Sequence, residues 1–590
     1  MKHIDLEPIG RRIDIDHDAD LLEITQDAGI EMAAVCGGEG WCGKCRVQLI
    51  AGELSPPTAD ELDQLTDAER AAGFRLACQA VPLGDVKIDI PPESLSTAQR
   101  LQLEGEEIQI EPDPVVIPVD LELDPPQLHD LRADTTRLHD ALTAQGHPAP
   151  RFGLDVLRSL PDALRQHDWR VRVALRGDEV VAVLPQGAPL LGLAVDLGTT
   201  KIAAYLVDLH SGEAIAKAGA PNPQVAYGED VVSRIAYANN HPGGLETLQS
   251  RVADRLNELL AELCLHAAAH LNQVVEAVIV GNTAMHHLFL GLPTRQLGEA
   301  PYVAAINDAA EVPAAQLGLA LAPGTYVYLP PNIAGYVGGD HVAMLLATRD
   351  RFDGVTIALD IGTNTEISLI DGERMLSCSC ASGPAFEGAH IQDGMRALPG
   401  AIERVLIHEG EVRTQTIDGA YPIGICGSGI LDAVAEMYGA GIVNQNGRLL
   451  NGSGYTLVPA GRTGHGRDIH ITRRDVHEIQ LAKGAIKAGV DVLLAEAGKN
   501  AGQIDRFIVA GAFGTYLDLS NAIRINMFPE LPLDRFQQVG NAAGIGARQM
   551  LISRQHRAIA ADLLRRVEYI ELTVHPGFTD IYVDALLFGE

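Results

Sequence analysis

Positive charge is scarce in this sequence: 45 Lys and Arg residues stand against 78 Asp and Glu residues, which gives a net charge of −33. A basic surface that would attract DNA, RNA or an anionic membrane is therefore not expected. No apolar run reaches the length of a transmembrane helix, and the first residues contain no apolar core of a secretory signal. We expect neither a nucleic-acid partner nor a membrane segment.

Cysteine is also scarce, with 8 in 590 residues. Four of them form one pattern, and the others, Cys264, Cys378, Cys380 and Cys426, are scattered in apolar or glycine-rich surroundings. This usage excludes a disulfide scaffold and indicates a reduced, cytoplasmic protein. The signature G-x-x-x-x-G-K-[ST] is absent, which excludes a P-loop ATPase. The length and the ordinary composition, 46% hydrophobic and 21% charged, predict several globular domains.

The most informative stretch is Cys36-Gly-Gly-Glu-Gly-Trp-Cys42-Gly-Lys-Cys45, with Cys78 downstream. Five residues separate Cys36 from Cys42 and two separate Cys42 from Cys45, close to the plant-type [2Fe–2S] spacing. The glycines let backbone N–H groups approach cluster sulfur atoms. We predict that these four cysteines bind a [2Fe–2S] cluster and that Trp41 shields it. The alternatives are a disulfide pair or a zinc site, although zinc ribbons usually carry two C-x-x-C pairs.

The surrounding pattern is that of a β-grasp ferredoxin. Strands are expected over residues 4–6, 12–15, 46–50 and 85–90, with helices over 20–28 and from a capping box at Thr58 to about Ala71. Residues 1–93 are therefore predicted to form a ferredoxin-like domain. The polar, acidic residues 94–114 are predicted to be a linker.

Residues 115–189, here called the small module, are predicted to be an α+β domain. Strands are expected over 115–123, 169–175 and 179–184, and helices over 127–144 and 153–166. The small module has no chemical motif, and dimerisation or docking is its expected role.

Residues 190–590 contain an internal repeat. Leu193-Ala-Val-Asp196-Leu-Gly-Thr-Thr-Lys resembles Ile357-Ala-Leu-Asp360-Ile-Gly-Thr-Asn-Thr. Each copy is a strand, an Asp-x-Gly-Thr turn and a second strand, which predicts a duplicated α/β unit facing itself across a cleft. Such a turn presents N–H groups and hydroxyls to an anion. An Asp beside a polyphosphate requires a cation between them, so the two aspartates imply Mg²⁺.

The residues of the two turns are the predicted phosphate contacts: Gly198, Thr199, Thr200, Lys201, Gly362, Thr363 and Asn364. The alternative for Lys201 is a side chain that points to solvent and contacts no phosphate. Glu366 and Glu387 are candidates to position a water molecule, with structural or surface roles as the alternative.

Further glycine-rich joints follow in the order expected of a two-lobed ATPase. Gly427-Ser428-Gly429 opens a helix whose N-terminus can meet a phosphate. The segment that contains Gly511 and Gly514 resembles an adenosine-binding strand and turn. Together these joints predict ATP in a cleft that opens and closes.

The Asp-x-Gly-Thr pair and the Gly511–Gly514 segment resemble the actin, sugar-kinase and heat-shock ATPase superfamily. With a ferredoxin domain in front, the whole chain resembles the reductive activators of corrinoid proteins. The segments that carry this second resemblance are Tyr227-Gly-Glu-Asp-Val-Val-Ser-Arg234, Gly281-Asn-Thr-Ala-Met285, Ala381-Ser-Gly-Pro-Ala-Phe-Glu387 and Gly424-Ile-Cys-Gly-Ser-Gly429.

The resemblance implies a homodimer that reduces a Co(II) corrinoid protein to Co(I), with ATP and an external low-potential electron donor, for a cobalamin-dependent methyltransferase system. Asp196, Asp360 and Glu366 would be the catalytic residues of the ATPase. The corrinoid-binding signature Asp-x-His-x-x-Gly is absent, so the corrinoid is expected on another protein.

Two other functions share these motifs: an ATP-dependent electron donor to a different low-potential metalloenzyme, and a redox sensor whose cluster state controls nucleotide binding. A kinase would leave the ferredoxin domain without a purpose. For Cys378 and Cys380 core packing is expected, with a cluster bridged across a dimer as the alternative. Cys426 is expected to be structural.

Overall fold

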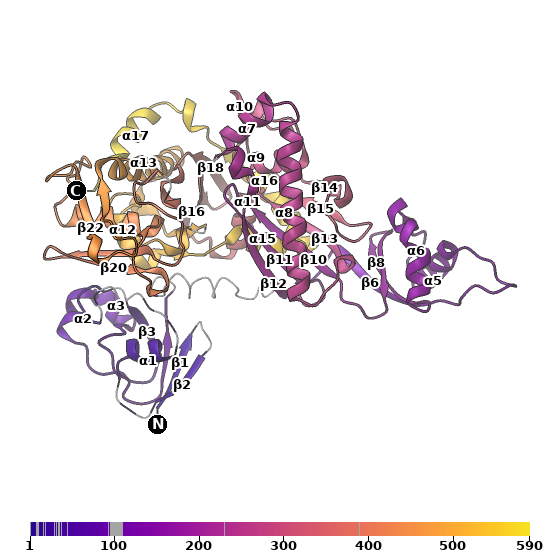
Figure 1. The fold of residues 1–590 in the computed structure, drawn as a ribbon, viewed down its shortest axis with the longest axis horizontal. Helices are drawn as coiled ribbons and strands as arrows, with labels where there is room; N and C mark the ends of the chain where they lie inside the picture. The colour runs from indigo at the N-terminus through magenta and orange to yellow at the C-terminus, as the bar shows by residue number, and fades with distance from the viewer. Residues whose placement is uncertain are drawn as a thin grey trace.

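The computed structural model arranges the chain as a ferredoxin-like domain, a small module and two lobes (Figure 1). It describes residues 2–7, 11–15, 17, 19–28, 30, 32, 36, 38–43, 45–91, 94, 110–228, 230–388, 390–511 and 513–589. Most of the predicted linker, and two residues of the cluster loop, lie outside the described residues. No helix in the described ranges is long and apolar enough to cross a membrane.

The N-terminal part is a β-grasp sheet, as predicted, with strand order β2-β1-β5-β3-β4 and β1 parallel to β5. Its strands are β1 (Lys2–Glu7), β2 (Arg11–Ile15), β3 (Arg46–Ala51), β4 (Phe74–Leu76) and β5 (Val86–Asp89), and its helices are α1 (Leu21–Asp27), α2 (Ala59–Gln64) and α3 (Asp67–Ala71). The single helix predicted from Thr58 to Ala71 is therefore two helices. Thr66 forms a second capping box with Glu69, which starts α3 anew.

One buried ion pair connects α2 to β4. Glu61 accepts from the Arg75 guanidinium at 2.8 Å through both of its oxygens, and it also accepts from the backbone N–H of Leu76 and Thr58. Burial is the largest influence and opposes the charge of Glu61, but the hydrogen bonds from Arg75, Leu76 and Thr58 together with the Arg75 charge outweigh it and lower the pKa of Glu61. Because β4 leads directly into Cys78, this pair fixes the segment that carries the distant cysteine.

The small module has strand order β6-β8-β9-β7 and lies at the end of the molecule opposite the ferredoxin domain (Figure 1). Its elements are β6 (Val116–Glu122), α5 (Asp134–Ala144), β7 (Arg151–Phe152), α6 (Leu154–Gln166), β8 (Arg170–Arg176) and β9 (Glu179–Pro185). The helix predicted from residue 127 begins only at Asp134, because Asp130 instead holds a turn through Arg132 and Arg137. Arg176 joins the module to the first lobe through Glu276 at 3.4 Å.

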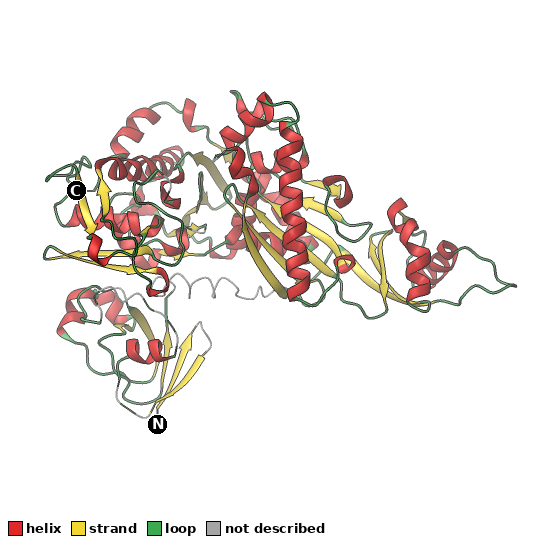
Figure 2. Cartoon of the chain, viewed as in Figure 1, coloured by secondary structure: helices red, strands yellow, loops and turns green. Residues whose placement is uncertain are grey.

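The two lobes share a five-stranded core, which confirms the predicted internal repeat: β12-β11-β10-β13-β15 corresponds to β18-β17-β16-β24-β25, and the sixth strand, β14 or β26, is added at opposite edges. The first-lobe sheet has the order β12-β11-β10-β13-β15-β14 and the second-lobe sheet has the order β25-β24-β16-β17-β18-β26. In each lobe an antiparallel hairpin (β10–β11 or β16–β17) pairs with a parallel strand (β13 or β24). Figure 2 shows helices packed against both sheets.

The bounds of the first-lobe elements are β10 (Leu191–Leu197), β11 (Lys201–Asp208), β12 (Ala214–Pro221), α7 (Val231–Asn240), α8 (Gly244–His266), β13 (Val274–Val280), α9 (Thr283–Leu290), α10 (Arg295–Gly298), β14 (Ala310–Pro313), β15 (Tyr326–Leu329) and α11 (Gly339–Thr348). The helices α15 (Ala542–Ile552) and α16 (Arg554–Arg566) come from the end of the chain and pack back onto α11.

The bounds of the second-lobe elements are β16 (Val355–Ile361), β17 (Thr365–Asp371), β18 (Arg374–Cys380), β19 (Ala401–His408), β20 (Glu411–Thr416), β21 (Gly424–Ile425), α12 (Gly427–Gly439), β22 (Gly454–Val458), β23 (Ile469–Thr472), α13 (Arg473–Glu496), β24 (Arg506–Ala510), α14 (Leu519–Arg524), β25 (Phe536–Gln538), β26 (Val567–Tyr569) and α17 (Phe578–Ala585).

Cys378 and Cys380 lie in the core of the second lobe. Their side chains belong to its apolar cluster, and the Cys380 thiol donates to the carbonyl of Thr365 at 3.3 Å. Burial raises the pKa of both thiols. A metal cluster bridged between subunits would need thiols at the surface, so the placement agrees with core packing.

Candidate functional site

The four predicted cluster ligands converge in the ferredoxin domain. Cys36, Cys45 and Cys78 are buried and Cys42 is half-buried, and the Cys45 and Cys78 sulfur atoms lie 3.4 Å apart. None of the four forms a disulfide. The disulfide alternative is therefore not what the structure shows.

The loop around Cys36 offers hydrogen-bond donors to sulfur. The thiol and backbone N–H of Cys42, and the backbone N–H groups of Gly40 and Gly38, bond to the Cys36 sulfur and lower its pKa to about 5. Gly38 and Gly40 have φ of 91° and 90°, which side chains with a Cβ rarely adopt. Thiolates surrounded by backbone N–H groups suit an iron–sulfur cluster, so these residues fit the group.

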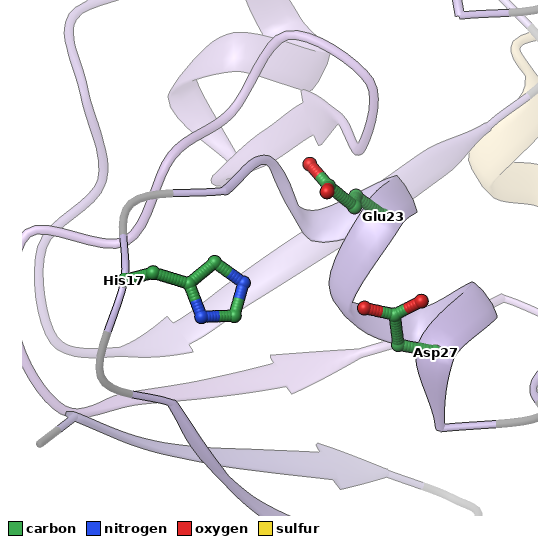
Figure 3. A group of neighbouring side chains, drawn as sticks. All are labelled: His17, Glu23 and Asp27. Atoms are coloured by element: carbon green, nitrogen blue, oxygen red, sulfur yellow. The ribbon is translucent and has the colours of Figure 1, made fainter.

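A second group of potential ligands lies elsewhere in this domain. Figure 3 shows His17 beside Glu23 and Asp27 of α1, with their ligand atoms within 4.8 Å of one another. All three residues are exposed, and exposed groups of this kind are common without an ion. We assign no metal to them.

The two Asp-x-Gly-Thr turns meet in the cleft between the lobes. The hydroxyls of Thr200 and Thr363 lie 3.2 Å apart, although 163 positions separate them in the sequence. The predicted site residues that line this cleft are Asp196, Gly198, Thr199, Thr200, Lys201, Asp360, Gly362, Thr363, Asn364, Glu366, Gly427, Ser428 and Gly511. The structure therefore brings both turns and the start of α12 to one place.

Two predicted residues lie outside this lining. Gly429 packs in the first turn of α12 against the carbonyl of Ile402, and Gly514 packs against the side chain of Val509. The side chain of Glu387, the second water-positioning candidate, lies outside the described residues.

Four carboxyl groups crowd the floor of the cleft. Burial raises the pKa of Asp196 to about 6, and burial together with the charge of Asp196 raises that of Asp360 to about 7. Burial and the charges of Asp360 and Asp196 raise the pKa of Asp340 to about 8. The pKa of Glu366 is also raised, by burial and by the charges of Asp340 and Asp360. Without a counter-charge these groups cannot all ionise near neutral pH.

Sequence reasoning missed Asp340. It lies in the first turn of α11, directly after Gly338-Gly339. A Cβ on Gly338 would come within 2.4 Å of the backbone at Asn282, so only glycine allows this close approach. The available signal was the Gly-Gly-Asp sequence before an apolar helix, which falls outside the repeat.

Amide groups hold the turns from the first lobe and from α15. Asn541 donates to the Asp196 carboxylate at 2.9 Å, and Asn282 donates to the Thr199 hydroxyl at 3.0 Å. The Asn541 bond partly opposes the rise in the pKa of Asp196.

Aromatic side chains also line the cleft. The rings of Phe386 and Phe513 stack with centroids 4.5 Å apart and an interplanar angle of 14°, and Tyr516 and Arg396 belong to the same lining. Flat apolar rings and a guanidinium suit a planar ring system. The cleft lining therefore combines acidic, hydroxyl-bearing and aromatic side chains.

Family models match the chain in sequence order. They are described as "2Fe-2S iron-sulfur cluster binding domain" over residues 4–83, "RACo linker region" over 105–188, "RACo middle region" over 191–350 and "C-terminal domain of RACo the ASKHA domain" over 354–590. The first covers the four cysteines, and the last two divide the two-lobed part between its two sheets.

Known proteins are similar over most of the chain. A solved structure titled "Reductive activator for corrinoid,iron-sulfur protein" is 36% identical, covers 100% of this chain and 98% of its own, and has a TM-score of 0.72. The corrinoid activation enzyme RamQ of Eubacterium limosum is 29% identical over 98% of both chains. A [Co(II) methylated amine-specific corrinoid protein] reductase of Methanosarcina barkeri is 26% identical over 68% of this chain and 77% of its own.

The close packing around Gly511 in the cleft leads to a prediction about stability. At Gly511, φ is +93°, and a Cβ would lie 2.5 Å from the Ile361 carbonyl oxygen and 2.6 Å from the Asp360 carboxylate. Gly511→Ala should therefore lose about 2–4 kcal/mol, from left-handed backbone and overpacking together. Gly498 also has positive φ but open space around it, so Gly498→Ala should lose only about 1–2 kcal/mol. Calorimetry of the full chain would compare the two, and equal losses would contradict the steric argument.

Proposed function

This chain belongs to the family of reductive activators of corrinoid proteins, and we propose that it uses ATP to reduce an inactive Co(II) corrinoid protein to Co(I). The corrinoid protein would serve a cobalamin-dependent methyltransferase system, and an external low-potential donor would supply the electron. The observation that carries the proposal is the presence, in one chain, of a [2Fe–2S] cysteine loop and a cleft built from two Asp-x-Gly-Thr turns.

Cys36, Cys42, Cys45 and Cys78 would hold the cluster, which supplies one-electron transfer when bound. Plant-type [2Fe–2S] centres lie near about −400 mV. Reduction of Co(II) to Co(I) is expected to need a lower potential still, so the electron moves uphill. For one electron, each ~59 mV changes the equilibrium tenfold, so a modest gap leaves little Co(I) without another source of free energy.

The cleft residues take distinct roles in this proposal. Asp196 and Asp360 face the Mg²⁺ that accompanies the phosphates, and the two turns and the N-terminus of α12 bind the phosphates themselves. The aromatic residues of the cleft lining take the adenine. Asp340 and Glu366 are the carboxyls left to position the attacking water.

The first experiment measures cobalt reduction. Holoprotein, a Co(II) corrinoid protein and a low-potential reductant are mixed with and without Mg-ATP, and corrinoid absorbance is followed. We expect Co(I) only with ATP, and at least a hundredfold slower reduction for Cys42→Ser, which loses a cluster ligand, and for Asp196→Ala. Cys264→Ala and Asp254→Ala, changed far from both sites, are the matched controls. ATP-independent reduction, or a fully active Asp196→Ala variant, would exclude the proposed role of the cleft.

The carboxyl groups that line the cleft predict a pH dependence. Carboxyls with pKa values of about 6 (Asp196), 7 (Asp360) and 8 (Asp340) are increasingly protonated as pH falls. A divalent cation must displace those protons. Affinity for Mn²⁺, used as the probe with a non-hydrolysable ATP analogue, should therefore rise about tenfold or more from pH 6 to pH 8, with proton release in calorimetry. Asp340→Asn should flatten the profile and Asp254→Asn should not; a flat wild-type profile would contradict a cation site here.

We also propose that the protein is a cytoplasmic homodimer. Large apolar side chains are exposed on the small module: Leu128 is 98% exposed, Leu131 80% and Leu154 62%. Neighbouring exposed apolar residues of this kind mark association surfaces. Sedimentation velocity should show a dimer that Leu128→Ser with Leu131→Ser converts to monomer, whereas Leu450→Ser, exposed on the second lobe, leaves it intact. A wild-type monomer at micromolar concentration would refute this assignment.

A further inference from the structure

Among the described residues, the cluster loop contacts the ATPase part at the β19–β20 hairpin, near its tip. Arg413 of β20 donates to the backbone carbonyl of Cys36 at 2.7 Å and forms an ion pair with Glu39 at 3.0 Å. Its guanidinium also lies over the ring of Trp41, 5.0 Å from the centroid. His408, at the end of β19, stacks on the same ring at 4.5 Å. Figure 1 shows the ferredoxin domain beneath β20.

We propose that this hairpin tip is a docking site for the cluster loop, and that nucleotide in the cleft releases it. The docked loop is the resting position, and the released loop is the one that meets the redox partners. The inference deepens the proposed function, on whose nucleotide site it rests.

Docking covers the residue next to the least buried cysteine of the loop. Cys42 is the half-buried ligand of the four, and Trp41, its neighbour in the sequence, lies against His408 and Arg413. In the proposal, a corrinoid protein or reductase that approached the loop over Trp41 would meet the hairpin. Docking and electron exchange therefore compete for one surface.

Charge complementarity selects this loop as the occupant of the hairpin tip. Glu39 accepts from the Trp41 indole N–H at 2.8 Å as well as from Arg413, and these two donors lower its pKa. Glu39 therefore stays anionic toward Arg413 at neutral pH. The chain has a net charge of −33, so positively charged side chains are scarce. Because one of them donates to the backbone carbonyl of Cys36, we regard the contact as a specific pairing.

The same hairpin is continuous with the wall of the cleft. At its root, Ala401 and Ile402 of β19 pair with β21, and β21 leads into Cys426-Gly427-Ser428 of the cleft lining. Cys426 is bonded to the Ile402 carbonyl through its backbone N–H at 3.0 Å. Arg396, which also lines the cleft, precedes β19 by a short loop. A nucleotide that moved either segment would move the hairpin, because strands transmit displacement along their length.

The contact is small enough to be reversible. Among the described residues it consists of one hydrogen bond to the Cys36 carbonyl, an ion pair between half-exposed side chains, one stacked ring pair and one cation–π contact. Surface ion pairs of this kind contribute little to stability and are screened by salt. Weak intramolecular contacts are readily shifted by a ligand that favours one state.

Zero-length cross-linking tests the release. Arg413→Lys keeps the positive charge and places an amine near Glu39, so a carbodiimide should join residues 39 and 413 in the holoprotein. We expect this cross-link without nucleotide and at least a threefold lower yield with Mg²⁺ and a non-hydrolysable ATP analogue. Arg565→Lys, beside Asp562 on α16, is the control: its local cross-link should not respond to nucleotide. Absence of the 39–413 cross-link, or a yield independent of nucleotide, would overturn the proposal.

The reduction potential supplies a second readout. Docking places the Arg413 charge beside the cluster loop, which favours the reduced, more negative cluster. Arg413→Gln should lower the reduction potential by at least about 28 mV, which is a threefold change in the one-electron equilibrium constant. Glu39→Gln should raise the potential. Arg565→Gln should leave it unchanged. An unchanged potential in Arg413→Gln would refute docking in solution. Neither measurement uses a corrinoid protein, so failure of corrinoid reduction alone would leave this inference standing.

Discussion

The meeting of two acidic turns in one buried cleft is the constraint on which the ATPase part depends. Duplication of the α/β unit brings Asp196 and Asp360 to strand ends that line one cleft, and α11 adds Asp340 to the same lining. Burial raises the pKa of all three carboxyls, and neighbouring carboxylates add to the rise at Asp360 and Asp340, so their close approach is electrostatically unfavourable. In the proposed function, a divalent cation with a polyphosphate would relieve both effects at once.

Local patterns predicted most of the residues that the structure brings together in the candidate site, but they could not predict contacts between residues distant in the sequence. The cluster cysteines and the two turns each lie within a short segment whose spacing reflects the chemistry, so they could be recognised without a structure. Asp340 was missed because it belongs to neither copy of the repeat. The helix predicted from Thr58 to Ala71 was divided because two capping boxes compete within it. The bond from Arg413 to Cys36 spans 377 positions, and no periodicity connects such a pair.

Free energy from the cleft can reach the cluster only through a segment that touches both. A ligand shifts a conformational equilibrium by its difference in affinity for the two states and by no more. The β19–β20 hairpin satisfies this requirement geometrically, since its root adjoins Gly427 and its tip holds Arg413. The buried second-lobe core around β18 offers no such path to the ferredoxin domain among the described residues, because its side chains pack on α13.

Carrying donor and ATPase on one chain also explains why the contact can be weak. Two modules joined by a short tether have an effective concentration of about millimolar, so even a low-affinity contact is substantially occupied. A strong contact would hold the cluster loop against the hairpin and keep Cys42 from any partner. A contact between separate proteins of the same strength would be mostly dissociated at cellular concentrations. Because the two modules share one chain and their contact is weak, the docked and released positions of the cluster loop have similar free energies in this proposal. Nucleotide binding has its largest effect on the populations of the two positions under this condition.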